Sequence, residues 1–364
     1  MRTMGVEEEL LLVDPESGSP AAVAGSVLAD AAARAGGHPA GEIEAELQQQ
    51  QIEVETTPTT SLTEIGTQVR DWRHRADELG RASNVRVVAL ATSPLPVDPR
   101  TTVKPRYRAM VERFGLTTME QLTCGCHVHV GVESDDEGVA VIDRLQPWLP
   151  CLLALSANSP FWHGRDSGYV SFRSQVWARF PTSGPTRPFG SPAAYRAHVD
   201  ELLASGVPLD GDMMYFNARL SRHYPTVEIR VADVCARTAD TVMIAGLARA
   251  LVDTTAAAWA AGEPAPGTDP DRLRLAQWQA GRSGPRGDLV DPVGGRPRPG
   301  PEVIGALLDY VDDALTANGD RDTVHAEVER VLAHGTGADH QRELLERTGD
   351  LSAVVRGSAE LTLA

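Results

Sequence analysis

Residues 124–131 read CGCHVHVG, and this stretch decides the fold because its side chains alternate between two kinds of chemistry. In an extended strand, successive side chains point to opposite faces. His127 and His129 therefore share one face, while the cysteines and valines share the other. The alternation predicts a strand over residues 122–132, with one apolar face packed against a core and one face carrying imidazoles.

The same one-sided alternation recurs in three other stretches, where carboxylates and a guanidinium replace the imidazoles. The positions on the polar faces are Glu7 and Glu9, Glu53 and Glu55, and Glu228 and Arg230. Glu8 is an exception, since alternation places it on the apolar side of its strand. The alternative is that these faces are ordinary solvated surfaces, but such surfaces usually mix Lys, Thr, Ser and Gln. Here almost every position is Glu, His or Arg.

A face of clustered carboxylates indicates a cation site. Two like charges 4 Å apart repel by about 4 kcal/mol at an effective dielectric constant near 20. Divalent cations relieve this repulsion, and oxygen ligands with an occasional histidine suit Mg²⁺, with Mn²⁺ as an alternative. The four strand faces therefore predict a site for hard metal ions, which also bridge substrate phosphates.

The composition excludes several classes of partner. The net charge of −16 repels nucleic-acid phosphates and anionic membranes. Lys104 is the single lysine, and the chain has no Gly-Lys-Ser/Thr sequence of a P-loop. If ATP binds, arginines and metal ions must therefore hold its phosphates. The absence of a long apolar run and of a signal-peptide pattern favours a cytoplasmic protein, with four buried, reduced cysteines.

The chain predicts one α+β domain over residues 1–364, with helices on one side of a sheet. Prolines 147 and 150 should kink the helix at 139–157, and the Gly/Pro/Arg-rich segment 281–301 is predicted to be a long loop. The expected strands are 5–13, the end of 46–55, 85–91, 122–132 and 227–234. The expected helices are 22–35, 61–83, 139–157, 240–261, 302–316, 321–333 and 338–347.

Two further stretches combine glycines, aromatic residues and arginines. Residues 159–169 read SPFWHGRDSGY, and residues 171–177 read SFRSQVW. Such a loop fits a substrate-binding wall; the alternative is a glycine-rich loop pinned by buried aromatic residues. Residues 223–226, HYPT, lead directly into the strand of Glu228 and Arg230.

These stretches together resemble the type 2 glutamate–cysteine ligase family of carboxylate–amine ligases. The resemblance spans nearly the whole chain and is weaker in its C-terminal third. It rests on residues 5–9 (GVEEE), Glu46 with Glu53 seven residues on, residues 124–131, 159–166, 173–177 (RSQVW) and 223–230 (HYPTVEIR).

The resemblance implies a glutamine-synthetase-like curved antiparallel sheet whose concave face holds ATP and metal ions. It implies weak glutamate–cysteine ligase activity, in which glutamate is phosphorylated by ATP to a γ-glutamyl phosphate and then attacked by cysteine. On this basis the metal-ligand candidates are Glu7, Glu9, Glu46, Glu53, His127 and Glu228. Arg230 and Arg173 are expected to stabilise the transferred phosphate or bind a substrate carboxylate, with Glu53 as a further catalytic residue. His129 is expected to contact ATP or a metal-bound water.

Two other functions remain open from sequence. One is a metal-dependent hydrolase built on His127 and His129, although zinc hydrolases usually use more histidines. The other is a non-catalytic, nucleotide-binding regulator that kept the fold. The expected partners are small molecules, an amino acid and an amine, with neither nucleic acid nor membrane; assembly into a homo-oligomer is compatible with the sequence.

Overall fold

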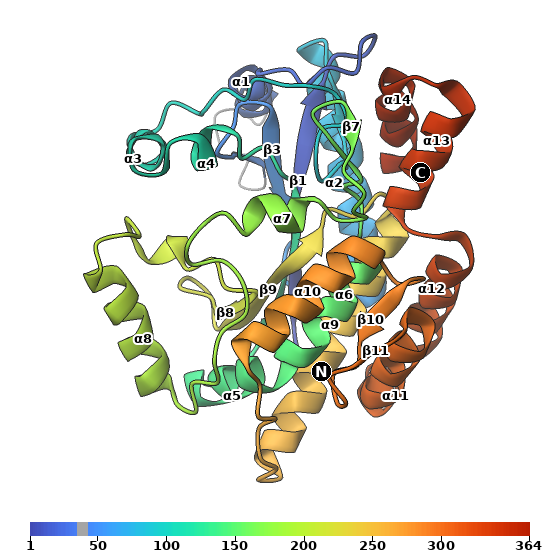
Figure 1. Cartoon of the computed structure of the whole chain (residues 1–364). Helices are drawn as coiled ribbons and strands as arrows, with labels where there is room; N and C mark the ends of the chain where they lie inside the picture. The colour runs from blue at the N-terminus through green and yellow to red at the C-terminus, as the bar shows by residue number, and fades with distance from the viewer. Residues whose placement is uncertain (35–42) are drawn as a thin grey trace.

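The structure is a computed structural model that describes residues 1–34 and 43–364. Its centre is a seven-stranded sheet in the order β2-β3-β1-β5-β9-β8, with the short strand β4 also paired to β1 (Figure 1). Every pair in this sheet is antiparallel, as predicted. The strands are β1 (Met4–Val13), β2 (Ile43–Ala45), β3 (Gln51–Glu55), β4 (Arg86–Val88), β5 (Gly125–Gly131), β8 (Ala218–Leu220) and β9 (Thr226–Asp233).

The apolar face of the sheet packs on long helices. Alternation directs Val128 and Val130 of β5 and Ile229 of β9 to this side, where they are buried with residues of the helices. The covering helices are α2 (Leu62–Ala82), α5 (Asp135–Leu145), α6 (Leu149–Leu155) and α9 (Thr238–Ala260). Burial of this apolar area is the main stabilising contribution to the fold. All four cysteines are buried and free, as predicted.

Two helical stretches are long and apolar enough by composition to cross a membrane, namely Asp135–Leu155 and Thr238–Ala260. However, 89% and 72% of the most apolar 18-residue segments of these stretches are buried inside the protein. Their apolar side chains therefore pack in the protein core. The first stretch is interrupted by a 3₁₀ turn at Gln146–Trp148, between α5 and α6. Pro147 and Pro150 lie at this break, which confirms the predicted kink.

Shorter elements border the opposite face of the sheet. Helices α3 (Pro105–Phe114) and α4 (Leu116–Met119) lie at one side, and α7 (Arg173–Trp177) crosses in front of the strands in Figure 1. Helix α1 (Ala24–Arg34) belongs to the part of the core beside β1 and β4; residue 35 of the predicted helix 22–35 lies outside the described residues. The remaining small elements are a hairpin of β6 (Phe161–Trp162) and β7 (Arg165–Asp166), and helix α8 (Pro192–Ala204).

The predicted long loop at 281–301 is wrong. Helix α10 (Pro270–Ser283) runs into it, and a hairpin of β10 (Asp288–Val290) and β11 (Pro297–Pro299) fills most of the rest. Leu289 is buried and anchors the hairpin in the core, whereas the prolines occupy a short edge strand, where a missing N–H is tolerated. The chain then continues through α11 (Gly300–Asn318), α12 (Arg321–His334), α13 (Gly337–Thr348) and α14 (Leu351–Thr362).

Glu8, the residue that broke the alternation, forms a buried ion pair. Its carboxylate accepts hydrogen bonds from Nε and an Nη atom of Arg73 on α2 at 2.8 and 2.7 Å, and from the hydroxyl of Thr241 at 2.7 Å. Arg73 also donates to the backbone carbonyls of Cys235 and Thr362. A buried charge is tolerated only when it is paired and hydrogen-bonded. This pair therefore links β1, α2 and the C-terminal helix α14 behind the sheet.

Candidate functional site

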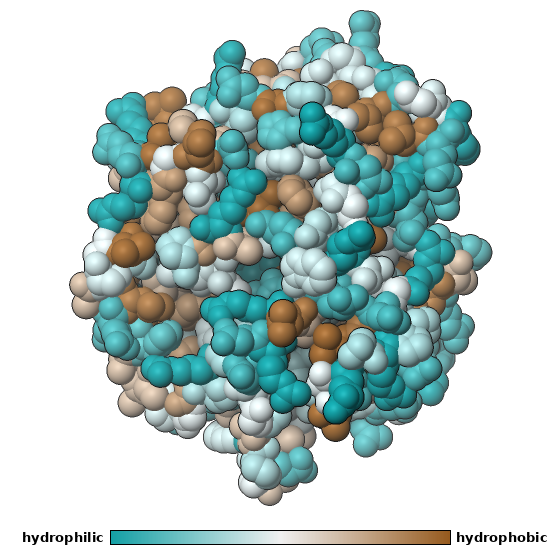
Figure 2. Space-filling model, viewed as in Figure 1, coloured by the Kyte–Doolittle hydropathy of each residue, from teal (hydrophilic) through white to brown (hydrophobic). Residues whose placement is uncertain are grey.

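The polar face of the sheet forms one wall of a cavity of about 320 Å³. Cross-strand register brings the predicted residues together: Glu7 lies opposite His127 and Glu55, while Glu9 lies opposite Glu53. On the other side of β5, His129 lies opposite Glu228. In the space-filling view, the middle of this face of the molecule is hollowed near α7 and β9, with mostly hydrophilic residues around the hollow (Figure 2).

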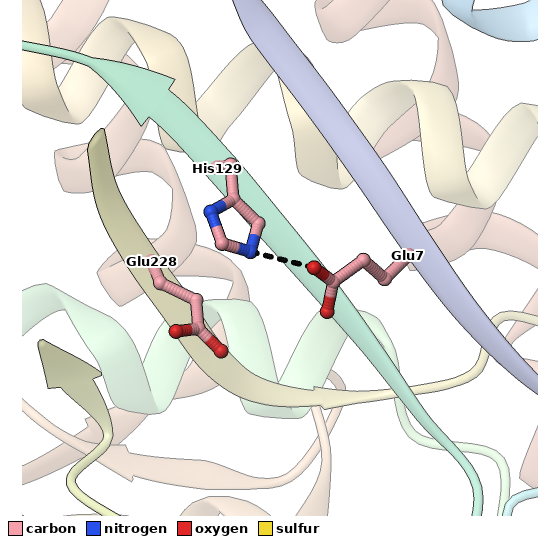
Figure 3. A group of neighbouring side chains, drawn as sticks. All are labelled: Glu7, His129 and Glu228. Carbon is pink, nitrogen blue, oxygen red and sulfur yellow. Dashed lines mark ion pairs between the residues drawn. The ribbon is translucent and has the colours of Figure 1, made fainter. Parts of the chain in front are cut away.

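Three groups of side chains in this cavity could each hold a metal ion, since the ligand atoms within each group lie within 4.8 Å of one another. Glu7 and Glu53 are each shared by two groups, so the three groups form a continuous row. The groups are Glu7–His129–Glu228, Glu7–Glu53–His127 and Glu9–Glu46–Glu53. Figure 3 shows the first, with side chains from β1, β5 and β9 pointing toward one another.

Burial raises the pKa values of all three carboxylates in the third group, and repulsion between neighbouring carboxylates adds to the effect. Burial, followed by the charge of Glu9, raises the pKa of Glu46 to about 7. Burial, followed by the charges of Glu46, Glu7 and Glu9, raises the pKa of Glu53 well above its usual value. The pKa of Glu9 is raised by burial too, although nearby arginine charge opposes the shift. A bound cation would favour the ionised form of all three carboxylates.

The two histidines converge on one carboxylate. His127 Nδ1 lies 3.1 Å from Glu7 Oε2, and His129 Nε2 lies 2.8 Å from Glu7 Oε1. Burial alone would raise the pKa of Glu7, but hydrogen bonds from both imidazoles hold that pKa well below its usual value. Burial and the charge of Arg230 lower the pKa of His127 to about 4. His127 is therefore neutral near pH 7, the state in which an imidazole can bind a metal ion.

Glu228 is paired with two arginines. Arg219 on β8 contacts both of its carboxylate oxygens, at 2.6 and 3.2 Å, and Arg230 on β9 contacts Oε1. Burial would raise the pKa of Glu228, but the charges of Arg230 and Arg219 outweigh it and lower that pKa. Nε of Arg230 is buried without a hydrogen-bond partner among the described residues. The cavity thus places guanidinium groups directly beside the carboxylate row.

The comparisons with known proteins agree with this geometry. A sequence model described as glutamate–cysteine ligase family 2 matches residues 3–357. A protein of Streptomyces avermitilis named "Putative glutamate--cysteine ligase 2-1" is 52% identical over 356 residues, covering 98% of each chain. One of Streptomyces coelicolor named "Putative glutamate--cysteine ligase 2" is 49% identical over 364 residues, covering 100% of each chain. The chain belongs to glutamate–cysteine ligase family 2.

Family membership makes the chain an ATP-dependent carboxylate–amine ligase, as predicted from sequence, and neither the hydrolase nor the regulator is favoured. Solved structures share its fold. A glutamate–cysteine ligase of Francisella tularensis in complex with AMP has a TM-score of 0.70 at 13% identity, covering 100% of this chain and 89% of that chain. A bifunctional glutathione synthetase of Pasteurella multocida has a TM-score of 0.69 at 16% identity, covering 100% and 51%.

Eight of the nine site residues predicted for this family 2 ligase line the cavity. Arg173 is not among the lining residues: it is 3% exposed, and its guanidinium covers Gly125 on the polar face of the sheet, close to His127. Its guanidinium is 3.9 Å from Asp233, measured from Nη1 to Oδ1. Asp233 in turn accepts hydrogen bonds from the hydroxyls of Ser159 and Ser171 at 2.7 and 2.9 Å.

The loop before α7 thus mainly holds Arg173 and neighbouring segments in place and does not line the cavity. Ser159 also accepts a hydrogen bond from the backbone N–H of Arg173 at 3.0 Å. Asp166 forms two hydrogen bonds of 2.8 Å with Arg342 on α13, and Phe161 is buried. Within this segment Trp177 lines the cavity, whereas residues 159–169 do not belong to its lining.

Sequence reasoning missed several residues of the ligase site. Alternation from Glu228 and Arg230 would place Asp233 on the apolar face, but a β-bulge between β5 and β9 adds a residue and pairs Asp233 with Gly125. Arg219 lies on a three-residue strand too short to show a period. Tyr107 and Tyr215 line the cavity from outside the predicted strands, and no local sequence pattern marks them.

Gly125→Ala is expected to lower ligase activity by about tenfold to a hundredfold without unfolding the protein, because small misplacements near the reacting groups are costly. A Cβ atom at this position would lie 2.3 Å from an Nη atom of Arg173 and 3.1 Å from Nε2 of His127. Steady-state kinetics and a thermal melt would check this. Gly305→Ala on α11 is the control, because its Cβ would meet nothing within 4 Å and it lines neither this cavity nor the one that adjoins it; similar activity losses in both variants would contradict the prediction.

Proposed function

We propose that the protein joins the side-chain carboxylate of glutamate to an amine, with cysteine as the first candidate, using Mg²⁺-bound ATP and a γ-glutamyl phosphate intermediate. The observation that carries this proposal is the continuous row of three carboxylate and imidazole groups, flanked by Arg230 and Arg219, on one wall of one cavity. Acyl phosphate formation brings anionic phosphates and a carboxylate together, and this row with its arginines supplies charge partners for them.

The reaction would proceed in two steps. An oxygen of the glutamate carboxylate attacks the γ-phosphorus of ATP, and the bond from that phosphorus to the β,γ-bridging oxygen breaks, releasing ADP. The amine nitrogen then attacks the acyl carbon, the carbon–oxygen bond to phosphate breaks, and the nitrogen loses a proton as inorganic phosphate leaves. The released phosphate therefore contains one oxygen from the acid.

The donor set fits Mg²⁺ or Mn²⁺. Carboxylates dominate all three groups, and the third contains carboxylates alone, as hard cations prefer. Such ions, when bound, would neutralise the negative charge that develops on the phosphates. We assign Glu7, Glu9, Glu46, Glu53, His127 and Glu228 as the residues that would hold them. Arg230, on the cavity wall with a free Nε, is assigned to the transferred phosphate.

We place ATP at the end of the row where His129 lies. There a second cavity of about 830 Å³ adjoins the first, and the two share Glu7, Glu55, His129 and Tyr224. This second cavity offers backbone and apolar groups as well as polar ones, which suits a nucleoside. His129 would contact the phosphates or a metal-bound water. Arg173, which covers Gly125 beside the cavity, is assigned a positioning role. We also propose a cytoplasmic location.

An isotope experiment tests the two-step scheme. Glutamate labelled with ¹⁸O in its side-chain carboxylate is incubated with ATP, Mg²⁺ and an amine, and the products are analysed by mass spectrometry. We expect one ¹⁸O atom in inorganic phosphate for each turnover. Label in AMP would indicate an adenylate instead, and phosphate release without label would indicate plain ATP hydrolysis; either result overturns the acyl-phosphate mechanism.

Mg²⁺ binding is expected to strengthen as the pH rises through about 7 and to release protons, because Glu46 must be ionised to bind the ion. The pKa of Glu46 in the folded protein lies above the ordinary value of 4.5. The free energy of unfolding of the metal-free protein should therefore fall as the pH rises from 4.5 through about 7, because Glu46 must then ionise in a buried site. Mg²⁺ should therefore raise the melting temperature more at high pH than at low pH. Calorimetry in two buffers of different ionisation enthalpy measures the protons; identical heats would contradict the prediction.

A further inference from the structure

The end of the cavity beyond the third carboxylate group is formed by two neutral amides. Gln51 and Gln121 both line the cavity and are only 2% and 3% exposed. Gln51 lies two residues before Glu53 on β3, so their side chains share the polar face. The amide oxygens of both glutamines are buried and accept no hydrogen bond within the described parts of the chain.

Thr123 contacts both amides, and its carbonyl fixes the orientation of Gln51. The amide nitrogen of Gln51 donates to the backbone carbonyl of Thr123 at 3.4 Å. A carbonyl can only accept, so the amide oxygen of Gln51 is the atom left for another partner. The amide nitrogen of Gln121 donates to the hydroxyl of Thr123 at 2.7 Å. Unpaired buried acceptors are costly, and two of them on one cavity wall indicate a ligand group that donates hydrogen bonds.

We infer that Gln51 and Gln121 are the residues that bind the α-ammonium group of the acid substrate. The inference rests on the proposed function, because it takes the carboxylate row as the place where the reacting carboxylate is phosphorylated. An ammonium group has three donors and no acceptor, which matches a pair of oxygens. The charge of Arg106, which also lines the cavity, is already paired, since Arg106 donates to Asp210 at 2.7 and 3.1 Å.

A binding experiment with the full chain tests the inference. L-glutamate and glutarate, which has the same carbon chain without the ammonium group, are titrated into the protein with Mg²⁺ and without ATP. We expect glutamate to bind about tenfold to a hundredfold more tightly, since hydrogen bonds to a charged group are strong. In Gln51→Met and Gln121→Met the glutamate-to-glutarate ratio should fall toward one. If these variants do not fold, Gln121→Glu replaces them: it keeps an acceptor, adds a negative charge and should increase the ratio.

Gln48→Met is the matched control. Gln48 is also a buried glutamine with an unpartnered amide oxygen, but it is not part of the cavity lining, so its loss should leave the ratio unchanged. A wild-type ratio near one, or variants that weaken both acids equally, would overturn the inference.

The same two acids separate this inference from the proposed function. ADP release is measured with each acid, ATP and an amine. If glutarate is used as well as glutamate, the ligase reaction stands and the inference fails. If neither acid releases ADP, the proposed function fails, and the binding ratio still decides whether the amides recognise an ammonium group.

Discussion

Glu53→Gln is expected to lower kcat by at least about a hundredfold, because charge stabilisation at a transferring phosphate is worth several kcal/mol. Glu53 belongs to two of the three metal-binding groups, and glutamine keeps its shape while removing the charge. The substitution should not lower the stability of the folded protein. The pKa of Glu53 is raised well above its usual value by burial and by neighbouring carboxylates, so a neutral side chain relieves repulsion in the metal-free state. The melting temperature without metal should therefore be unchanged or higher.

Glu44→Gln provides the matched control for this variant. Glu44 lies opposite Glu53 on β2, is exposed, and belongs neither to the three groups nor to the lining of the two cavities. Its loss should change kcat by no more than about threefold, as is usual for substitutions away from a critical contact. Turnover by Glu53→Gln close to that of Glu44→Gln, with both proteins folded, would refute the role of Glu53 as a metal ligand.

Arg230→Lys is expected to lower kcat by about tenfold to a hundredfold and to raise the KM for ATP by less, because lysine keeps the charge but loses the planar fork. The side chain of Arg230 is 10% exposed, contacts Glu228, and lies 6.0 Å from the centre of the Trp177 ring. The lysine still offers Glu228 a positive partner. The variant therefore removes the planar, two-pronged donor arrangement of arginine but keeps its charge. Steady-state kinetics with ATP and with the amino acid varied in turn would measure both parameters.

Arg219→Lys is the comparison for Arg230. Arg219 pairs with the same carboxylate through both of its oxygens, so its fork is already engaged by the protein. We expect a smaller fall in kcat than for Arg230→Lys. If Arg230→Lys instead raises only the KM for the amino acid, Arg230 binds that substrate and does not act on the phosphate.

Much of this site could be predicted because strand alternation is a local property. The side chains of His127 and His129 share a face whenever residues 125–131 are extended, whatever lies beyond them. The same reasoning led to Glu53 and Arg230, and the family resemblance added Glu46 and Arg173. Segments without a period were predicted less well, and the hairpin within 281–301 is an example. There a buried Leu289, supported by tertiary contacts, outweighs the turn-forming tendency of glycine and proline.

Sequence by itself determined the antiparallel sheet with its two chemically distinct faces, the family, and the residue types available for cations and phosphate. Only the tertiary structure decided which carboxylates share a group, because that depends on cross-strand register. It also placed Arg173 over Gly125 on the polar face and turned Asp233 to the same face through a bulge. It brought Gln51 and Gln121, 70 residues apart in the chain, onto Thr123. The physical reason is that alternation is fixed within a strand, whereas pairing, bulges and cavity walls depend on contacts between distant segments.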